Sequence, residues 1–357
     1  MKPGCKRGCR GLFVALFLIA LVAAATVAWL WNGYTTFADR PIAGLKAGDT
    51  MQVATGDSFA AVLRKLRQEG IDEGHDLEWR VLARQLDAAS SLKVGEYALE
   101  PGTTPRGLLR DMRDGKVLVY RITIVEGWNI RQLRAALAAA TPLVQEALEL
   151  DDAALMRRLG HEGQHPEGRF LPETYVYSRG DSDLDVLARA HKAMDVALAN
   201  AWKARDPDLP LQSAEEALIL ASIIEKETGI ASERPQIAGV FARRLKLGMR
   251  LQTDPTVIYG IGSAYDGNIR RSHLLTDTPY NTYTRAGLTP TPIAMPGVDA
   301  LQAAVNPAPG DSLYFVALGD GSGRHAFSAS LAEHNAAVGR YLRELRQSRA
   351  SEQATVQ

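Results

Sequence analysis

Residues 213–229 read SAEEALILASIIEKETG, and this stretch decides the core of the fold. Ser213, followed three residues later by a glutamate, forms a capping box, which predicts that a helix begins there. The segment Leu218–Ile224 is apolar nearly all round, which is typical of a helix buried on all sides. A threonine and a glycine end the predicted helix. We therefore expect a central buried helix that carries the charged triplet Glu225–Glu227 at its C-terminal end.

The two glutamates of this triplet are candidates for acid–base chemistry. Glu225 and Glu227 lie two residues apart, so their side chains point about 200° apart around a helix axis. The negative end of the helix dipole and partial desolvation both raise the pKa of a carboxyl at this position. A raised pKa is what a general acid needs at neutral pH. The alternative, a solvated pair tied to Lys226 or Arg234, stays open from the residues alone.

A second apolar stretch lies near the N-terminus. Residues 11–31 carry no charge, and a helix of this length, at about 1.5 Å per residue, crosses a hydrocarbon core of about 30 Å. The charges before it are all basic, which predicts that residues 1–10 form a cytoplasmic tail and that the body is periplasmic. We favour a single-pass inner-membrane anchor over a cleaved signal peptide, whose apolar region has only about 7–15 residues.

Composition narrows the class of protein. The chain has 357 residues with 41 Lys+Arg, 41 Asp+Glu and 46% hydrophobic residues. These values exclude a disordered chain, a collagen-like chain and a strongly basic nucleic-acid binder, so no nucleic-acid partner is expected. Cys5 and Cys9 both precede the apolar run, so the exported part has no disulfide. We expect both cysteines in a solvated tail rather than in a metal or redox site.

The remaining sequence predicts an α+β protein with a small and a large domain. Residues 32–48, polar with Gly and Pro, are expected to form a linker. Residues 49–116 are predicted to form a small βααβ subdomain with a further helix. Its expected elements are a strand at 51–54, a helix capped by Ser58, a helix at 76–86, a strand at 95–99 and a helix capped by Thr103 or Thr104. The apolar face expected for the second helix consists of Leu77, Val81, Leu82 and Leu86.

Residues 117–346 are predicted to form the larger mixed α/β domain, and residues 347–357 a polar tail. Besides the central helix, its expected elements are a strand at 117–125, helices at about 129–140, 143–159, 183–204 and 235–247, a proline-rich loop region at 279–309, a hairpin of 313–318 with 324–327, and a final helix at 331–346.

Three short motifs match catalytic patterns only superficially. His161–His165 reads H-E-x-x-H, but the surrounding glycines and prolines argue against the helix that a zinc site needs, so a polar loop is expected. Ser90–Lys93 reads S-x-x-K without the partner motifs of that enzyme class, which favours a turn. The glycine run at Gly319–Gly323 does not open a helix, which favours a hairpin turn over a phosphate site.

Several longer blocks resemble the YceG-like family of endolytic murein transglycosylases, in order and in spacing. The blocks are Val125–Gly127, Glu167–Tyr175, Ala221–Pro235, Gly248–Gly260, Tyr280–Tyr283 and Gly287–Ile293. The sequence departs from the family pattern at Glu173, where Asp is usual, and at Thr289 and Met295. The resemblance covers nearly the whole chain.

The resemblance implies cleavage of peptidoglycan glycan strands between MurNAc and GlcNAc, leaving 1,6-anhydro-MurNAc ends. It implies that Glu227 is the catalytic residue, that no metal or organic cofactor takes part, and that residues 49–116 are LysM-like. It also makes the wall-synthesis machinery a candidate partner by analogy. Candidates for lining the sugar cleft, each with loop bracing as the alternative, are Glu173, Tyr175, Glu225, Gln252, Thr253, Asp254, Tyr259, Asn281, Thr282 and Tyr283. A muramidase-type hydrolase and a non-enzymatic wall-binding scaffold remain as rival functions.

Overall fold

The computed structural model describes residues 5–355 and divides them into two compact units. The first unit holds the chain up to Tyr120 together with Ser178–Gly180. The second holds Arg121–Tyr177 and the chain from Asp181 onward. Each unit has its own hydrophobic core and mixes helices with short two-stranded sheets, as the sequence predicts.

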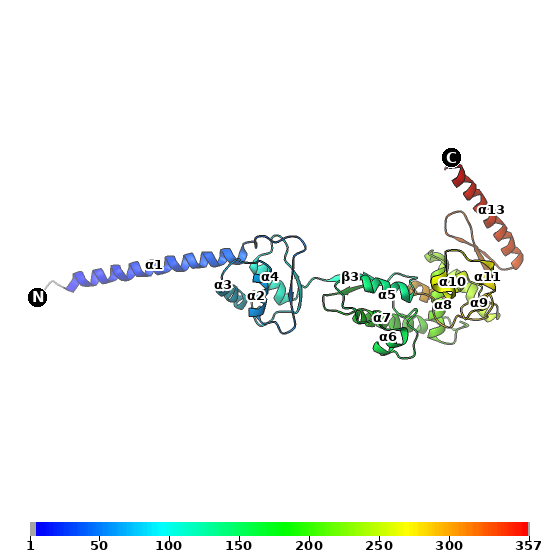
Figure 1. The fold of residues 1–357 in the computed structure, drawn as a ribbon, viewed down its shortest axis with the longest axis horizontal. Coiled ribbons are helices and arrows are strands. Elements are labelled where there is room, and N and C mark those ends of the chain that lie inside the picture. The colour runs from blue at the N-terminus through cyan, green and yellow to red at the C-terminus, as the bar shows by residue number, and fades with distance from the viewer. Residues whose placement is uncertain (1–4, 356–357) are drawn as a thin grey trace. The chain divides into compact units, whose positions relative to one another are not determined.

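The N-terminal helix α1 runs from Cys5 to Asp39 and includes the apolar run (Figure 1). From Leu12 onward it is long and apolar enough to cross a membrane, with a mean hydropathy of 2.6. Its last turns belong to the core of the first unit: the Phe37 ring lies 5.4 Å from that of Trp79, and Ala38 is fully buried. The linker predicted at 32–48 is therefore wrong for its first eight residues, because these helical turns are packed rather than solvated.

The first unit packs three short helices against one antiparallel sheet. Its elements are β1 (Thr50–Val53), α2 (Phe59–Gln68), α3 (Asp76–Gln85), β2 (Gly95–Ala98) and α4 (Pro105–Asp114). Ser58 and Thr104 accept hydrogen bonds from the first turns of α2 and α4, which confirms both predicted caps. The predicted apolar face of α3 is partly wrong. Leu77 and Val81 are exposed, because Trp79 and its neighbours on the adjacent face fill the core.

The second unit begins with a strand and ends with a long helix. Its elements are β3 (Tyr120–Thr123), α5 (Ile130–Ala139), α6 (Asp152–Arg158), β4 (Thr174–Tyr177), α7 (Asp183–Lys203), α8 (Ala214–Glu227), η1 (Ala231–Glu233), α9 (Arg234–Lys246), α10 (Asp254–Ile261), η2 (Gly262–Ala264), α11 (Arg271–Leu275), α12 (Val298–Val305), β5 (Tyr314–Ala317), β6 (His325–Ser328) and α13 (Leu331–Thr355). Within the described residues, β3 pairs with β4 and β5 with β6.

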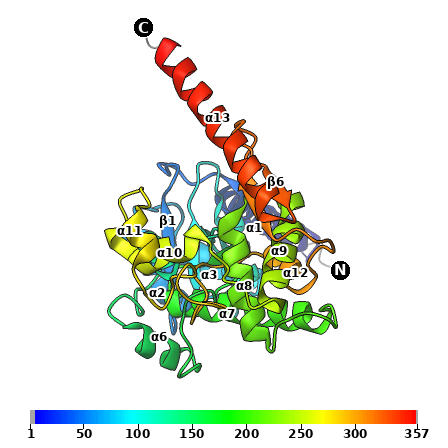
Figure 2. The same cartoon turned by 90° about the vertical axis from the view of Figure 1, so that its right-hand side faces the viewer.

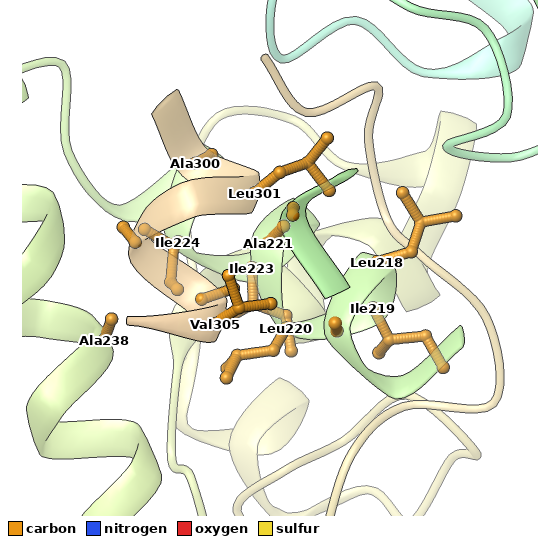
Figure 3. Packing of buried hydrophobic residues seen from close by; sticks show 14 of the residues in the cluster. Leu218, Ile219, Leu220, Ala221, Ile223, Ile224, Ala238, Ala300, Leu301 and Val305 are labelled. Carbon is orange, nitrogen blue, oxygen red and sulfur yellow. The ribbon is translucent and has the colours of Figure 1, made fainter. Parts of the chain in front are cut away.

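Helix α8 is the buried centre of this unit, as its composition predicts. Every residue of Ala217–Ile224 is buried. Figure 3 shows Leu301 and Val305 of α12 beside the apolar side chains of α8, with Ala238 of α9 beyond them. Ser222 is the one polar residue in this run, and its hydroxyl donates to the Ile219 carbonyl at 2.7 Å and accepts from the Ile293 N–H at 3.0 Å. This hydroxyl is fully satisfied, so it does not oppose burial of the helix.

Two predicted segments differ from the structure. Only α6 forms within the helix expected at 143–159. Before it, the Asp183 carboxylate accepts hydrogen bonds from the N–H groups of Glu146 and Ala147 at 2.9 and 3.0 Å, which holds the chain in turns. The loop region expected at 279–309 contains α12, whose apolar residues are buried in the core of the unit, against α8. Both outcomes depend on contacts far along the chain rather than on local pattern.

The predicted hairpin and final helix are present, and α13 begins beside the hairpin (Figure 2). Side chains of α9 and η1 hold this hairpin in place. Arg243 donates to the Ser312 carbonyl at 2.7 Å, and the buried Glu233 pairs with the imidazole of His325 at 2.7 Å. The hairpin is thereby fixed to the helix that follows α8.

Candidate functional site

Glu227 is the last residue of α8, where the buried helix reaches the surface. The preceding apolar residues fix the axis of the helix, so the direction of this side chain follows from the core. Glu227 is partly buried and lines a cavity of about 420 Å³. The remaining lining residues are Arg244, Leu251, Gln252, Asp254, Tyr283, Tyr314, Phe315, Val316, Leu331, His334 and Val338.

The carboxyl of Glu227 has the protonation behaviour of a general acid at neutral pH. Burial raises its pKa from 4.5 to about 7, and the negative charge of Asp254 adds to the rise. The Thr253 hydroxyl donates a hydrogen bond to Oε1, which acts in the opposite direction by stabilising the carboxylate. Near neutral pH the group therefore exists in both forms, which is the condition for donating a proton and taking one back.

The backbone that presents Thr253 to Glu227 is strained and braced. Gln252 has φ 54, a left-handed conformation that a residue with a β-carbon seldom adopts. Arg244, which is buried, donates to the carbonyls of Arg250 and Leu251 at 3.0 and 2.9 Å and to Oε1 of Gln252 at 3.3 Å. The sequence did not indicate Arg244, because nothing in a helical arginine shows that it faces a loop.

A second brace comes from the segment 281–283. The Thr253 N–H donates to the Thr282 hydroxyl at 3.0 Å, and the Tyr283 hydroxyl donates to the Asp254 carboxylate at 2.6 Å. Asn281 is buried, and its amide donates to the carbonyls of His273, Leu274 and Thr276. Asn281 and Thr282 thus brace loops, whereas Tyr283 also lines the cavity.

Three other residues expected in the cleft lie outside that cavity. Tyr175 is buried and donates to the Leu171 carbonyl at 2.8 Å, so it belongs to the core. Glu173 is exposed on the segment leading into β4. Tyr259 donates to the carboxylate of Glu167 at 3.0 Å. The hydroxyls of Tyr175 and Tyr259 are thus used within the fold, and a place for the three residues in the sugar cleft stays a prediction.

Glu225 faces away from Glu227, as their two-residue separation predicts. Its side chain is 6% exposed and accepts from the Gly297 N–H at 3.0 Å. Arg234 lies 3.5 Å from it and also contacts Glu126 at 3.6 Å. Burial raises the pKa of Glu225 although Arg234 opposes the rise. The alternative considered for the pair, a tie to Arg234, therefore describes Glu225 but not Glu227.

The opposite wall of the cavity comes from the hairpin and the final helix. The Arg244 guanidinium lies 5.0 Å from the centre of the Tyr314 ring, and the His334 ring stacks on Tyr314 at 5.2 Å. His334 Nδ1 is buried without a hydrogen-bond partner among the described residues. Nothing in the sequence signalled these residues, since Tyr314 lies 87 positions and His334 107 positions beyond the end of α8 at Glu227.

Glu167 was also missed, although it begins one of the recognised blocks. It is fully buried, accepts from the Ile130 N–H at 3.0 Å and from the Tyr259 hydroxyl, and burial raises its pKa to about 7. It joins the start of α5 to α10, which is the helix that begins with Asp254. Glu167 is therefore a structural carboxyl behind the site rather than a wall of the cavity.

One group of side chains in residues 5–355 has metal-ligand composition: His161, His191 and Asp195. The rings of His161 and His191 stack at 3.7 Å with 18° between their planes. Stacked rings direct their nitrogen lone pairs side by side, whereas ligands of one ion must converge on it. His161 and His165 lie in a non-helical loop, which confirms that the H-E-x-x-H match does not form the helical zinc motif.

Comparisons with known proteins point to one family. The model of the YceG-like family matches residues 51–340. A Bacillus subtilis protein named endolytic murein transglycosylase is 30% identical over 310 residues, which cover 82% of this chain and 84% of that protein. A Streptococcus pneumoniae protein of the same name is 26% identical, covering 85% of this chain and 61% of that protein. A crystal structure of a YceG-like protein from Listeria monocytogenes is 28% identical with TM-score 0.52, covering 80% of this chain and 97% of that one.

Proposed function

The chain belongs to the YceG-like family, and from that membership we propose that it is an endolytic lytic transglycosylase of peptidoglycan with Glu227 as its acid and base. The relatives named above support the reaction class. The single observation that carries the residue assignment is the partly buried Glu227 carboxyl, with pKa about 7, at the wall of a cavity. The substrate is the glycan strand, cleaved between MurNAc and GlcNAc.

The first step breaks the glycosidic bond. Protonated Glu227 donates its proton to the glycosidic oxygen, the bond from MurNAc C1 to that oxygen breaks, and the GlcNAc side leaves as an alcohol. Because the Thr253 hydroxyl already donates to Oε1, the transferable proton belongs on Oε2. The Asp254 carboxylate lines the same cavity and would stabilise the positive charge that develops on the MurNAc ring.

The second step closes the anhydro ring. The C6 hydroxyl of the same MurNAc attacks C1, and the Glu227 carboxylate takes the hydroxyl proton, which restores the starting acid. The nucleophile is tethered to the reacting sugar, so its effective concentration is high. No second carboxylate is needed to activate water, and Glu225 is occupied by the Gly297 N–H and Arg234.

A muramidase-type hydrolysis is the second candidate function, and Asp254 is the observation that favours it. An exposed carboxylate on the same cavity could act as base toward a water molecule instead of stabilising the ring charge. The two reactions differ in their products, since hydrolysis leaves a reducing MurNAc end. The third possibility, a scaffold that binds the wall without cleaving it, would use the first unit alone.

We further propose that α1 anchors the protein in the inner membrane, with the N-terminus cytoplasmic and the catalytic domain periplasmic. The length and apolarity of the helix support this, as do the basic residues before it. Packing of Phe37 and Ala38 in the first unit argues against a cleaved signal, because removing the helix near these residues would open the core.

The domain assignment remains part of the proposal. Residues 49–116 would serve as the LysM-like, glycan-binding subdomain and residues 117–346 as the catalytic domain. Anchoring keeps the cleft near newly made strands, and the wall-synthesis machinery is the candidate partner by family analogy. The reaction as written needs no cofactor.

The test is a digest of purified peptidoglycan strands by the full-length protein in detergent, with the products identified by mass spectrometry. We expect internal cleavage with 1,6-anhydro-MurNAc ends, and a loss of at least a hundredfold in rate for Glu227→Gln. Glu225→Gln, two residues earlier in the same helix, is the matched control and is expected to retain cleavage. Reducing MurNAc ends would favour the hydrolase, and full activity of Glu227→Gln would refute the site.

A further inference from the structure

A second cavity adjoins the one at Glu227. It has a volume of about 500 Å³, and its lining residues are Arg250, Gln252, Arg271, Leu274, Leu275, Tyr283 and Thr284. Gln252 and Tyr283 line both cavities, so the two lie on adjacent parts of the surface around these side chains. The second cavity therefore lies next to a ligand bound at Glu227, on the surface of the same unit.

The charges of the second cavity are of one sign. Arg250 and Arg271 line it, and no carboxylate is among its lining residues. Neighbouring arginines are neutralised by acidic partners, Arg270 by Asp266 and Arg285 by Asp277. Within residues 5–355 the structure gives neither Arg250 nor Arg271 an ion pair. These two guanidinium groups are the cations left available for a ligand.

The geometry of Arg250 and Arg271 suits carboxylates. Arg250 is held by one hydrogen bond, from Nη1 to the Tyr283 carbonyl at 3.0 Å, which orients the group while its other donors stay open. Arg271 is exposed at the start of α11. A guanidinium presents five N–H donors in a planar fork that matches a carboxylate.

The second cavity is also apolar on one side. Leu275 is 67% exposed and lies beside Leu274, so two leucines face the same space as the arginines. A glycan strand without peptides offers hydroxyls and amides, with the lactyl carboxylate and methyl of each MurNAc as its one anion and one aliphatic group per disaccharide. A short acidic peptide offers both carboxylates and methyl groups, which matches the paired arginines and leucines.

We propose that the cavity of Arg250, Arg271 and Leu275 binds the acidic peptide stem carried by MurNAc, so that the protein prefers peptide-bearing strands to bare glycan. This rests on the proposed function, because the stem reaches the cavity only when its sugar occupies the cleft at Glu227. It also explains how the chain after the apolar run, which has 37 basic against 41 acidic residues once the four basic residues before the run are left out, holds an acidic polymer. The attraction is local, and the overall charge does not have to be favourable.

The test compares peptidoglycan strands with the same strands after an amidase has removed the peptides, which leaves one lactyl carboxylate on each MurNAc in place of the stem. Binding is measured with full-length Glu227→Gln in detergent, so that no cleavage occurs. We expect at least tenfold tighter binding of the peptide-bearing strands, with the preference decreasing as salt is raised. Equal affinity for the two ligands would overturn the proposal.

Substitutions of Arg271 test whether this cavity causes the preference for peptide-bearing strands. Arg271→Gln is expected to reduce it to less than threefold, and Arg271→Glu to abolish it, whereas the adjacent Arg270→Gln is the control expected to keep it. Arg271 is exposed, so its replacement should not affect folding. A full preference in both Arg271 variants would refute the assignment of the cavity.

Cleavage by the wild-type protein separates the two proposals. Anhydro ends formed equally from both substrates would leave the lytic function intact and reject the peptide site. Retained binding preference without cleavage of either substrate would reject the lytic function and leave the peptide site intact.

Discussion

Replacing Thr253 by valine tests how the acid is tuned. The Thr253 hydroxyl donates to Glu227 Oε1 and stabilises the charged form of the acid, so it holds the pKa of Glu227 below the value that burial alone would give. Thr253 is 2% exposed, and valine has nearly the same shape, so Thr253→Val removes the hydrogen bond with little change in packing.

The size of the effect follows from the charge on the acceptor. A hydrogen bond to a charged group contributes about 1.5–3 kcal/mol, and about 1.36 kcal/mol corresponds to one pH unit. Glu227 must be protonated to act, so activity falls as pH rises through its pKa of about 7. Loss of the hydrogen bond raises that pKa further. The descending limb of kcat/KM should therefore move to higher pH by about 1–2 pH units.

The assay measures initial rates of anhydro-end formation between about pH 5 and pH 10. Thr253→Ser keeps the hydroxyl and is the matched control, with a limb expected at the wild-type position. An unchanged limb in Thr253→Val, or a limb displaced to lower pH, would refute the reasoning about Glu227.

Three further outcomes are expected. Glu227 has a folded-state pKa of about 7 against an ordinary 4.5, so the folded protein loses stability as pH rises through this window. Glu227→Gln carries no charge and should therefore be more stable than the wild type at pH 8. The expected gain in the free energy of unfolding, measured with denaturant in detergent, is roughly 2–3 kcal/mol. A less stable variant at pH 8 would contradict this. Arg244→Lys cannot satisfy both backbone carbonyls of the strained loop. The free energy of unfolding should therefore fall by about 2 kcal/mol, and the rate of cleavage should fall at least tenfold. A wild-type rate of cleavage would argue against the bracing role of Arg244. Phe37→Ala removes the ring packed on Trp79 and should lower the stability of the first unit by about 2 kcal/mol, measured by thermal unfolding. Unchanged unfolding of the first unit would mean that the last turns of α1 do not contribute to its core.

Local sequence signals were sufficient where neighbouring residues decide the structure. The caps at Ser58 and Thr104 mark helix starts because a side-chain oxygen binds an N–H two or three residues ahead. The burial of α8 follows from its run of apolar residues, which only Ser222 interrupts. The opposite directions of Glu225 and Glu227 follow from helix geometry alone.

Predictions from the sequence were wrong where residues far along the chain provide the hydrogen-bond or packing partners of a segment. Asp183 binds backbone N–H groups at Glu146 and Ala147, which prevents the helix expected there. The first part of the expected linker is helical because Phe37 and Ala38 pack in the core of the first unit.

The sequence by itself determined the buried helix, the apolar N-terminal segment and the pair of candidate acids Glu225 and Glu227, because each depends on spacing along one stretch of chain. The choice of Glu227 between the two came from the resemblance to the family. Only the tertiary structure decided what surrounds that carboxyl. The hydroxyl of Thr253, the brace by Arg244 and the wall with Tyr314 come from separate segments, brought together by packing on α8 and α9. A pKa of about 7 is a property of that assembly, since desolvation exists only after distant segments exclude water from the side chain.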